Sequence, residues 1–149
     1  MNEIKRDFSE FHGHTLEALK PGMSAAIART VSEADILQFA GVSGDMNPVH
    51  LDAEFGAASM FGGRIAHGML SAAYISAVLG TKLPGPGSIY LSQTLKFKAP
   101  VKIGDTVVTR VTIREIKAEK RRVILDTVCT VAGKPVLEGE AEIMIPALS

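Results

Sequence analysis

Polar and apolar residues alternate with a period of two along most of the second half of the chain. The alternating stretches cover residues 88–98, 107–113, 123–131 and 137–145. In the first of them Ile89, Leu91 and Phe97 share one face, whereas Ser92 and Lys96 lie on the other. This period is typical of strands with one buried face. We therefore expect four consecutive strands.

Short turns separate the later stretches, at Gly104-Asp105 and at Gly133-Lys134-Pro135. Because turns of this length join antiparallel neighbours, the strands should form one antiparallel sheet. An earlier strand-like segment, residues 23–31, is expected to join it. A Pro-Gly cluster between residues 83 and 87 separates the strands from a first half with helical patterns.

One helical segment, residues 65–79, is almost wholly apolar. Its small residues Ala72, Ala73 and Ala77 allow close approach, and Gly80 is predicted to end it in a left-handed cap. A helix with so little polar surface must be covered all round, which one curved sheet can do. The pattern therefore predicts an α+β fold of the hot-dog type, an antiparallel sheet wrapped around one long apolar helix.

Two shorter helices are predicted before the apolar one. Ser32 or Glu33 can open a helix over residues 34–40, and Asp52 can cap another over residues 53–58. The segment between these two helices is an insertion into the hot-dog pattern. It concentrates polar residues between apolar flanks.

Composition is that of one globular domain. The 149 residues are 46% hydrophobic and 21% charged, enough for a sizeable core. We expect an N-terminal extension over residues 1–20 and a single domain over residues 21–149. Sixteen basic and sixteen acidic side chains cancel, so no overall field favours nucleic acid or an anionic membrane as a partner.

The chain is expected to work in the cytoplasm and without a metal. The first twenty residues have no apolar signal region, and the run at residues 65–79 is too short to span a membrane. Cys129 is the only cysteine, which excludes an intramolecular disulfide framework and a cysteine-rich zinc site. His12 and His14 lie together without further nearby ligands, so we interpret them as solvated tail residues.

Candidate chemistry begins in the insertion, at Ser43-Gly44-Asp45-Met46-Asn47-Pro48-Val49-His50. The Asn-Pro step favours a turn, which could bring the Asp45 carboxylate and the His50 imidazole together. Such a pair can share one water molecule, with one group removing a proton while the other supplies one. The alternative is that Asp45 and Asn47 only form turns and that His50 is a surface residue beside a helix.

A second candidate segment, Gly62 to Met69, runs from a glycine-rich loop into the apolar helix. The N–H groups and the positive dipole end of a helix N-terminus can stabilise a developing enolate oxygen. Gly68 would let a substrate approach the backbone closely. The alternative is that Gly68 only permits tight packing and that His67 is a core histidine.

Together the two segments resemble the MaoC-like (R)-specific enoyl-CoA hydratases, also called hydratase 2. The family motif is an aromatic residue, a spacer and Ser-Gly-Asp-x-Asn-Pro-aliphatic-His, which here is Phe39 followed by residues 43–50. His-Gly at residues 67–68 and Gly-Ser-Ile-Tyr at residues 87–90 also match. The resemblance covers residues 23–146. It departs from the family at Gly56, where alanine or serine is more frequent.

The resemblance implies a hot-dog homodimer, or a larger homo-oligomer, in fatty acid metabolism. The implied reaction is the reversible syn hydration of trans-2-enoyl-CoA to (R)-3-hydroxyacyl-CoA, with no metal or organic cofactor. Asp45 and His50 are the implied catalytic residues, and the Gly68 amide is the implied oxyanion donor. Asn47, His67 and Ser76 are implied to bind or orient the acyl-CoA substrate, although Ser76 could instead bond to the preceding helical turn.

Coenzyme A also carries phosphates, which local cations could bind. Arg64, Lys96, Lys98 and Lys102 are candidates, although exposed lysines on strands are usually only solubilising. Three alternative functions remain open. They are a 3-hydroxyacyl thioester dehydratase acting on acyl-carrier-protein (ACP) substrates, a hot-dog thioesterase, and a non-catalytic acyl-CoA-binding protein.

Overall fold

The structure is a computed structural model that describes residues 7–148. Its six strands form one antiparallel sheet in the order β1-β4-β5-β6-β2, with β3 also paired to β6. The strands are β1 (Ser24–Thr30), β2 (Ile89–Gln93), β3 (Lys96–Phe97), β4 (Thr106–Lys117), β5 (Arg122–Val131) and β6 (Lys134–Met144). The α-helices are α1 (Glu33–Ser43), α2 (Pro48–Leu51), α3 (Ala53–Ala58) and α4 (Gly68–Thr81). Three 3-10 helices are η1 (Ser9–Phe11), η2 (Leu16–Ala18) and η3 (Ala118–Lys120).

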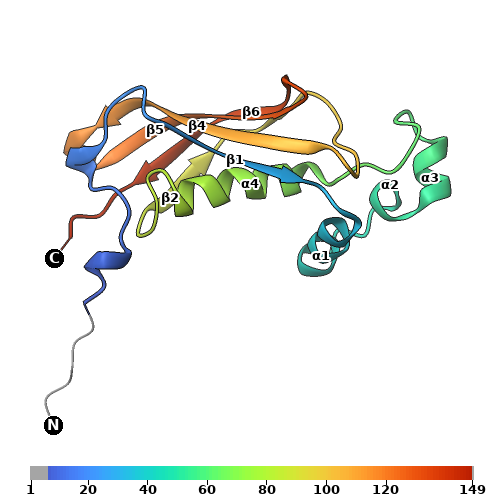
Figure 1. The fold of residues 1–149 in the computed structure, drawn as a ribbon, viewed down its shortest axis with the longest axis horizontal. Coiled ribbons are helices and arrows are strands. Elements are labelled where there is room, and N and C mark those ends of the chain that lie inside the picture. The colour runs from blue at the N-terminus through green and yellow to red at the C-terminus, as the bar shows by residue number, and fades with distance from the viewer. Residues whose placement is uncertain (1–6, 149) are drawn as a thin grey trace, which may run out of the picture.

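The long helix α4 lies along one face of the sheet, and α1, α2 and α3 lie beyond one end of it (Figure 1). Ile75, Val78 and Leu79 of α4 are buried in one core with Leu125 and Leu137 of the sheet. Burial of each such side chain contributes about 1.5–3 kcal/mol relative to leaving it in water. The predicted α+β fold, one curved sheet on one apolar helix, is confirmed.

The two ends of α4 differ from the sequence prediction. The helix begins at Gly68, after His67 as its N-cap, and runs to Thr81. The predicted left-handed cap at Gly80 is wrong, because Gly80 lies within the helix and is not among the residues with positive φ. The chain reverses a few residues later instead, where Gly85 has a φ of 93°.

The stretch predicted as one strand over residues 88–98 is divided into β2 and β3. Both pieces pair with β6, and the chain between them bends over Gly139. A Cβ on Gly139 would lie 1.8 Å from the carbonyl oxygen of Thr94, so only glycine fits there. Thr94 is held to Glu140 by its backbone N–H, at 2.9 Å, and by its hydroxyl, at 3.0 Å. A period-two pattern does not reveal such a break.

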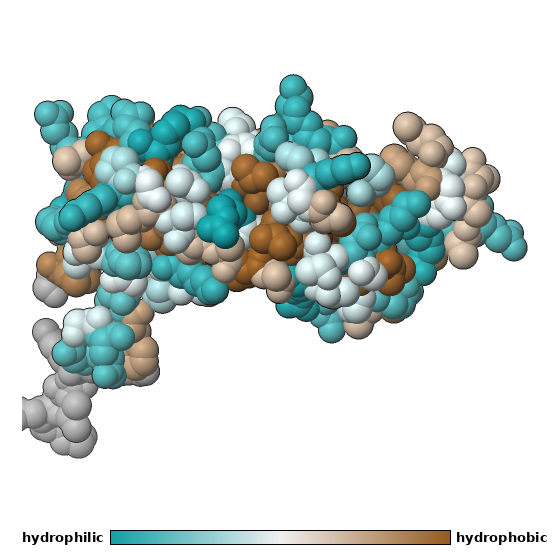
Figure 2. Space-filling view, turned by 45° about the horizontal axis from the view of Figure 1, so that its top comes forward, coloured by the Kyte–Doolittle hydropathy of each residue, from teal (hydrophilic) through white to brown (hydrophobic). Residues whose placement is uncertain are grey.

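The chain does not cover α4 all round, which also differs from the expectation. Met69, Ala73, Ser76 and Ala77 remain exposed on the helix. In Figure 2 apolar areas are visible between polar ones in the middle of the face shown. One side of α4 is therefore left without a partner within the described residues.

The predicted division into residues 1–20 and 21–149 stays a prediction. Within the described part, Leu16 and Leu19 are buried in the core. No helix among residues 7–148 is long and apolar enough to cross a membrane.

Candidate active site

The loop that carries Asp45 is shaped by short-range hydrogen bonds. Gly44 ends α1 with a φ of 78°, a conformation that favours glycine. The Ser43 hydroxyl donates to the Phe39 carbonyl oxygen at 2.6 Å and accepts from the Asp45 N–H at 3.1 Å. Asp45 Oδ1 in turn accepts from the N–H of Asn47 at 3.2 Å. The Asp45 side chain itself stays exposed.

Helix α2 has only four residues, and its start is fixed by sequence. Asn47 is the N-cap, and its Oδ1 accepts from the N–H of Val49 at 3.1 Å. Pro48 follows at the first helical position, where its missing N–H costs nothing. The turn predicted at Asn-Pro is confirmed, and it leads directly to His50.

His50 is buried, with 7% of its surface exposed, so the alternative of a surface residue is wrong. Its Nδ1 donates to the carbonyl oxygen of Ile65 at 2.9 Å. Because a carbonyl oxygen can only accept, Nδ1 carries the proton, and Nε2 is left with a lone pair in the neutral ring.

His67 links the two candidate catalytic residues. Its Nε2 donates to the backbone carbonyl oxygen of Asp45 at 2.9 Å, and its ring is stacked on that of His50 with centroids 3.9 Å apart. The ring of Phe39 also packs against His67, tilted by 54°, with ring centroids 4.8 Å apart. His67 Nδ1 is buried without a hydrogen-bond partner among the described residues.

Asp45, His50 and His67 offer ligand atoms that all lie within 4.8 Å of one another. The two imidazoles are stacked with an interplanar angle of 29°. A metal ion must lie in the plane of each ring that binds it, so stacked rings are poorly placed to share one. Because His67 Nε2 is engaged with the Asp45 carbonyl oxygen and its Nδ1 is buried, Asp45 and His50 are the members of this cluster that can exchange protons with a water molecule.

A cavity of about 570 Å³ opens beside this cluster. Asp45, His67, Gly68, Ser71 and Lys98 are its polar or glycine lining residues, and His50 does not line it. The apolar lining residues are Met60, Phe61, Ile65, Ala66, Met69, Phe97, Ala99, Pro100, Val101, Val136 and Leu137. The mainly apolar wall is suited to an acyl chain, and the polar groups gather where a reaction could occur.

Gly68 is the first residue of α4, and no side chain caps this end of the helix. Its helix N-terminus therefore faces the cavity with uncapped N–H groups. The predicted residues Asp45, His50, His67 and Gly68 are thus brought together, with Asn47 shaping the turn between the first two.

Ser76 is not brought to this cavity, because it lies on the exposed side of α4. Ser71 lines the cavity instead, which the sequence interpretation missed. Ser71 follows Gly68 by three residues and so lies on the same helix face, and this spacing could have identified it from the sequence. The Ser71 carbonyl oxygen accepts from the thiol of Cys129 at 3.6 Å, and burial raises the pKa of that thiol.

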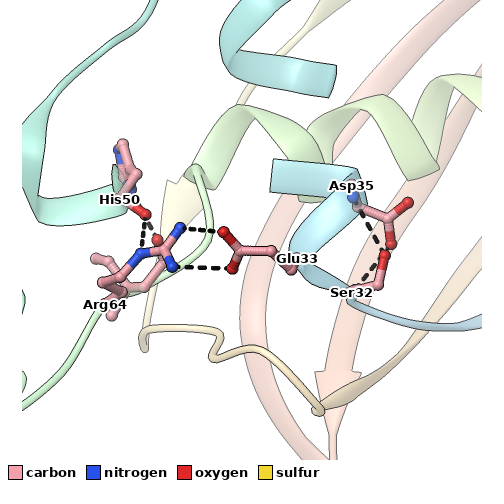
Figure 3. A network of polar contacts seen from close by, with 6 residues as sticks. Ser32, Glu33, Asp35, His50 and Arg64 are labelled. Carbon is pink, nitrogen blue, oxygen red and sulfur yellow. Dashed lines mark hydrogen bonds and ion pairs between the residues drawn. The ribbon is translucent and has the colours of Figure 1, made fainter. Parts of the chain in front are cut away.

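The cationic residues that could bind the coenzyme A phosphates have different surroundings. Arg64 is already paired with both carboxylate oxygens of Glu33 (Figure 3). Lys102 Nζ donates to the carbonyl oxygen of Phe61 at 3.2 Å. Lys98 lines the cavity and lies 3.8 Å from Glu138. Lys98 is therefore the cation best placed to meet a charged part of a substrate.

Known proteins resemble this chain over most of its length. The sequence profile of the family described as "MaoC like domain" matches residues 16–134. An (R)-specific enoyl-CoA hydratase from Rhodospirillum rubrum is 58% identical over 134 residues, which are 90% of this chain and 93% of the relative. A 3-hydroxybutyryl-CoA dehydratase from Methylorubrum extorquens is 48% identical over 130 residues, which are 87% of this chain and 83% of the relative. The structure of the unliganded R-hydratase PhaJ1 from Pseudomonas aeruginosa superposes with a TM-score of 0.86 at 48% identity, over 92% of this chain and 88% of that one.

Proposed function

Since the chain belongs to the MaoC-like domain family, we propose that it is a lyase that hydrates trans-2-enoyl-CoA reversibly to (R)-3-hydroxyacyl-CoA. The observation that carries this function is the cluster of Asp45, His50 and His67 beside an apolar cavity. Two of its relatives are named (R)-specific enoyl-CoA hydratase and 3-hydroxybutyryl-CoA dehydratase, and these names describe the two directions of one type of reaction.

In the proposed mechanism, Asp45 and His50 hold one water molecule. The water oxygen forms a bond to the β-carbon while one of the two residues removes a water proton. The electron pair of the double bond moves toward the thioester, and the other residue supplies a proton to the α-carbon. No oxidant or further reactant is needed. The two groups are close enough to be coupled, so either can begin as the base.

Gly68 is proposed to stabilise the enolate that develops during this addition. Its N–H lies at the N-terminus of α4, where the helix dipole adds to hydrogen bonding. Oxyanion donors of this kind contribute roughly 10²- to 10³-fold in kcat. Asn47 and His67 are proposed to orient the pair, Asn47 as the cap of α2 and His67 through its bond to Asp45. Ser76 is retained as a substrate contact only in an assembly that brings a second chain to α4.

A homodimer in the cytoplasm is part of the proposal. β2 is at the edge of the sheet, with Ile89, Tyr90 and Leu91 exposed along it. An exposed apolar edge strand beside an uncovered helix face is a surface that a second copy would bury. Cys129, the chain's only cysteine, is a free thiol, as expected in a reducing compartment.

The test is to follow crotonyl-CoA with the purified protein and determine the chirality of the product. Loss of the enoyl absorbance with formation of (R)-3-hydroxybutyryl-CoA is expected for the wild type. Asp45→Asn and His50→Ala should each lower kcat by at least about 100-fold, as loss of acid-base catalysis typically does. The matched controls Asp126→Asn and His14→Ala, at exposed or half-buried positions away from the cavity, should keep full activity.

Three results would contradict parts of this proposal. Release of free CoA from the thioester would favour a thioesterase. Turnover of an ACP-linked enoyl chain, without turnover of enoyl-CoA, would show that the substrate is carried by ACP and not by coenzyme A. Tight acyl-CoA binding by a folded protein without any turnover would favour a binding protein.

A further inference from the structure

Helix α2 is too short to hold its own position. Four residues make little more than one helical turn, and most stability of a helix in a protein comes from contacts outside it. The carbonyl oxygens at a helix C-terminus have no partner within the helix. In α2, the carbonyl oxygen of His50 accepts from Arg64 Nε at 2.6 Å. The backbone of the candidate catalytic histidine is therefore held by a side chain from another segment.

Arg64 is itself held in place by α1. Its Nη1 and Nη2 donate to the two carboxylate oxygens of Glu33 at 2.9 and 3.0 Å, and Figure 3 shows this fork between Glu33 and the His50 carbonyl. Glu33 is the first residue of α1, directly after the N-cap Ser32. Ser32 and Asp35 form a reciprocal capping box that fixes this helix end. The capping box thus fixes the position of Glu33 independently of its contact with Arg64.

The residue after Arg64 holds the other end of His50. The Ile65 carbonyl oxygen accepts from His50 Nδ1 at 2.9 Å, and the Ile65 N–H donates to the Val49 carbonyl oxygen at 3.2 Å. Arg64 and Ile65, which are neighbours in the sequence, therefore bond to the backbone and to the ring of His50, respectively. Because one peptide bond joins them, a displacement of the Arg64 backbone would also displace the Ile65 carbonyl oxygen that accepts from the His50 ring.

From this arrangement we propose that Arg64, oriented by Glu33, is a positioning residue that fixes the place and the tautomer of His50. The planar guanidinium uses three N–H groups in two directions at once, toward a carboxylate and toward a carbonyl. A lysine ammonium has no such planar fork and cannot reproduce both contacts at the same geometry. Arg64 acts through His50 and does not touch the reacting atoms. Its side chain is only 17% exposed, which also argues against a role in phosphate binding.

The kinetic test uses Arg64→Lys and Glu33→Gln with crotonyl-CoA. It rests on the proposed hydratase function. Arg64→Lys should lower kcat about 10- to 100-fold, because a displacement of about 1 Å in a catalytic group can cost that much. KM should change less than about twofold. Arg114→Lys is the matched control, since Arg114 also bridges two carboxylates, Asp126 and Glu140, but on the sheet. The control should retain wild-type kcat.

A second test does not depend on any enzymatic activity. Ring nitrogen shifts of ¹⁵N-labelled histidine report which nitrogen is protonated, and His50→Ala assigns the signal among the four histidines. Wild-type His50 should be an Nδ1–H tautomer, and Arg64→Lys should give a mixture of tautomers. If the wild type fails to hydrate crotonyl-CoA but shows this shift, the proposed function is wrong and the positioning role stands.

The two variants also test whether Glu33 acts through Arg64. If Arg64→Lys does not fold, kcat, KM and the His50 tautomer are measured on Glu33→Gln instead, because this variant keeps the side-chain shape. In a folded double variant the effect on kcat should be smaller than the product of the single effects. A raised KM with unchanged kcat would overturn the proposal in favour of substrate binding by Arg64. Wild-type kcat together with an unchanged His50 tautomer would overturn it outright.

Discussion

The ring of Phe97 lies against Gly68 so closely that a Cβ on this glycine would be 2.6 Å from Cε1 of the ring. Phe97 belongs to the short strand β3, and Gly68 is the first residue of α4. Both residues line the cavity. The close contact therefore brings the edge of the sheet against the helix end that is proposed to bind the thioester oxygen.

Gly68→Ala should lower kcat/KM for crotonyl-CoA by at least about tenfold, because the methyl group would intrude where an oxyanion donor must approach the substrate. The Phe97 ring is half exposed and can rotate away, so the melting temperature should change little. Steady-state kinetics and thermal unfolding monitored by circular dichroism measure the two effects.

Gly80→Ala is the control within the same helix. A Cβ there meets nothing within 4 Å, so activity should be unchanged and stability should rise by up to about 1 kcal/mol. Equal activity of Gly68→Ala and Gly80→Ala would remove the proposed role of Gly68.

Ser32→Ala should lower the free energy of unfolding by about 1 kcal/mol, because it removes the side chain that accepts from the Asp35 N–H at 3.1 Å. Urea denaturation gives this difference. Ser9→Ala, at an exposed position of η1 whose side chain makes no capping bond, is the comparison and should change the free energy of unfolding by less than about 0.5 kcal/mol. Equal values for the two variants would mean that the capping box does not stabilise α1.

Leu91→Glu should convert a dimer into a monomer. Leu91 is 41% exposed on the edge strand β2, and a carboxylate there would have to be desolvated between two chains. Light scattering after size exclusion should give about twice 15.8 kDa for the wild type and one chain mass for the variant. Val108→Glu, on the inner strand β4, should remain dimeric. A monomeric wild type at micromolar concentration would contradict the proposed assembly.

The two tyrosines predict a loss of stability at high pH. Tyr90 is 39% exposed, but partial desolvation of its phenol raises the pKa from 10.0 to about 12, and desolvation raises the pKa of the buried Tyr74 as well. Because these values lie above those of the unfolded chain, the folded state holds the phenolic protons more tightly. This contribution is fully present below pH 10 and is lost as the pH rises toward about 12.

Absorbance of the phenolate measures this effect directly. The native protein should titrate well above pH 10, and the protein unfolded in guanidinium should titrate near 10. Tyr90→Phe leaves Tyr74 as the only tyrosine and separates the two. A native titration midpoint at pH 10 would show that neither phenol is protected.

The extent to which sequence predicted this structure differed between elements. Period-two alternation predicted the strands that form the middle of the sheet, because buried and exposed faces must alternate there. It missed the break at Thr94, which depends on how closely another strand passes over Gly139. The left-handed cap expected at Gly80 is wrong because the helix continues through Gly80 to Thr81, with Lys82 as its C-cap.

In the candidate site, too, the sequence predicted the features that depend on neighbouring residues and missed those that depend on distant ones. Local sequence predicted the turn from Asp45 to His50, since Asn47 and Pro48 determine it within three residues. The contact of Arg64 with Glu33 joins residues 31 positions apart, so no local pattern contains it. The stack of His50 on His67 likewise depends on how two loops meet, although both histidines were identified as candidates.

The position of Cys129 gives the protein an internal reporter. Its thiol is fully buried between β5 and the Ser71 carbonyl of α4, and burial raises its pKa. A thiol reagent needs an exposed thiolate, so it can modify only molecules in which the helix has separated from the sheet. As no other cysteine competes, the rate of modification counts the fraction of open molecules in a native population, with no label or mutation introduced.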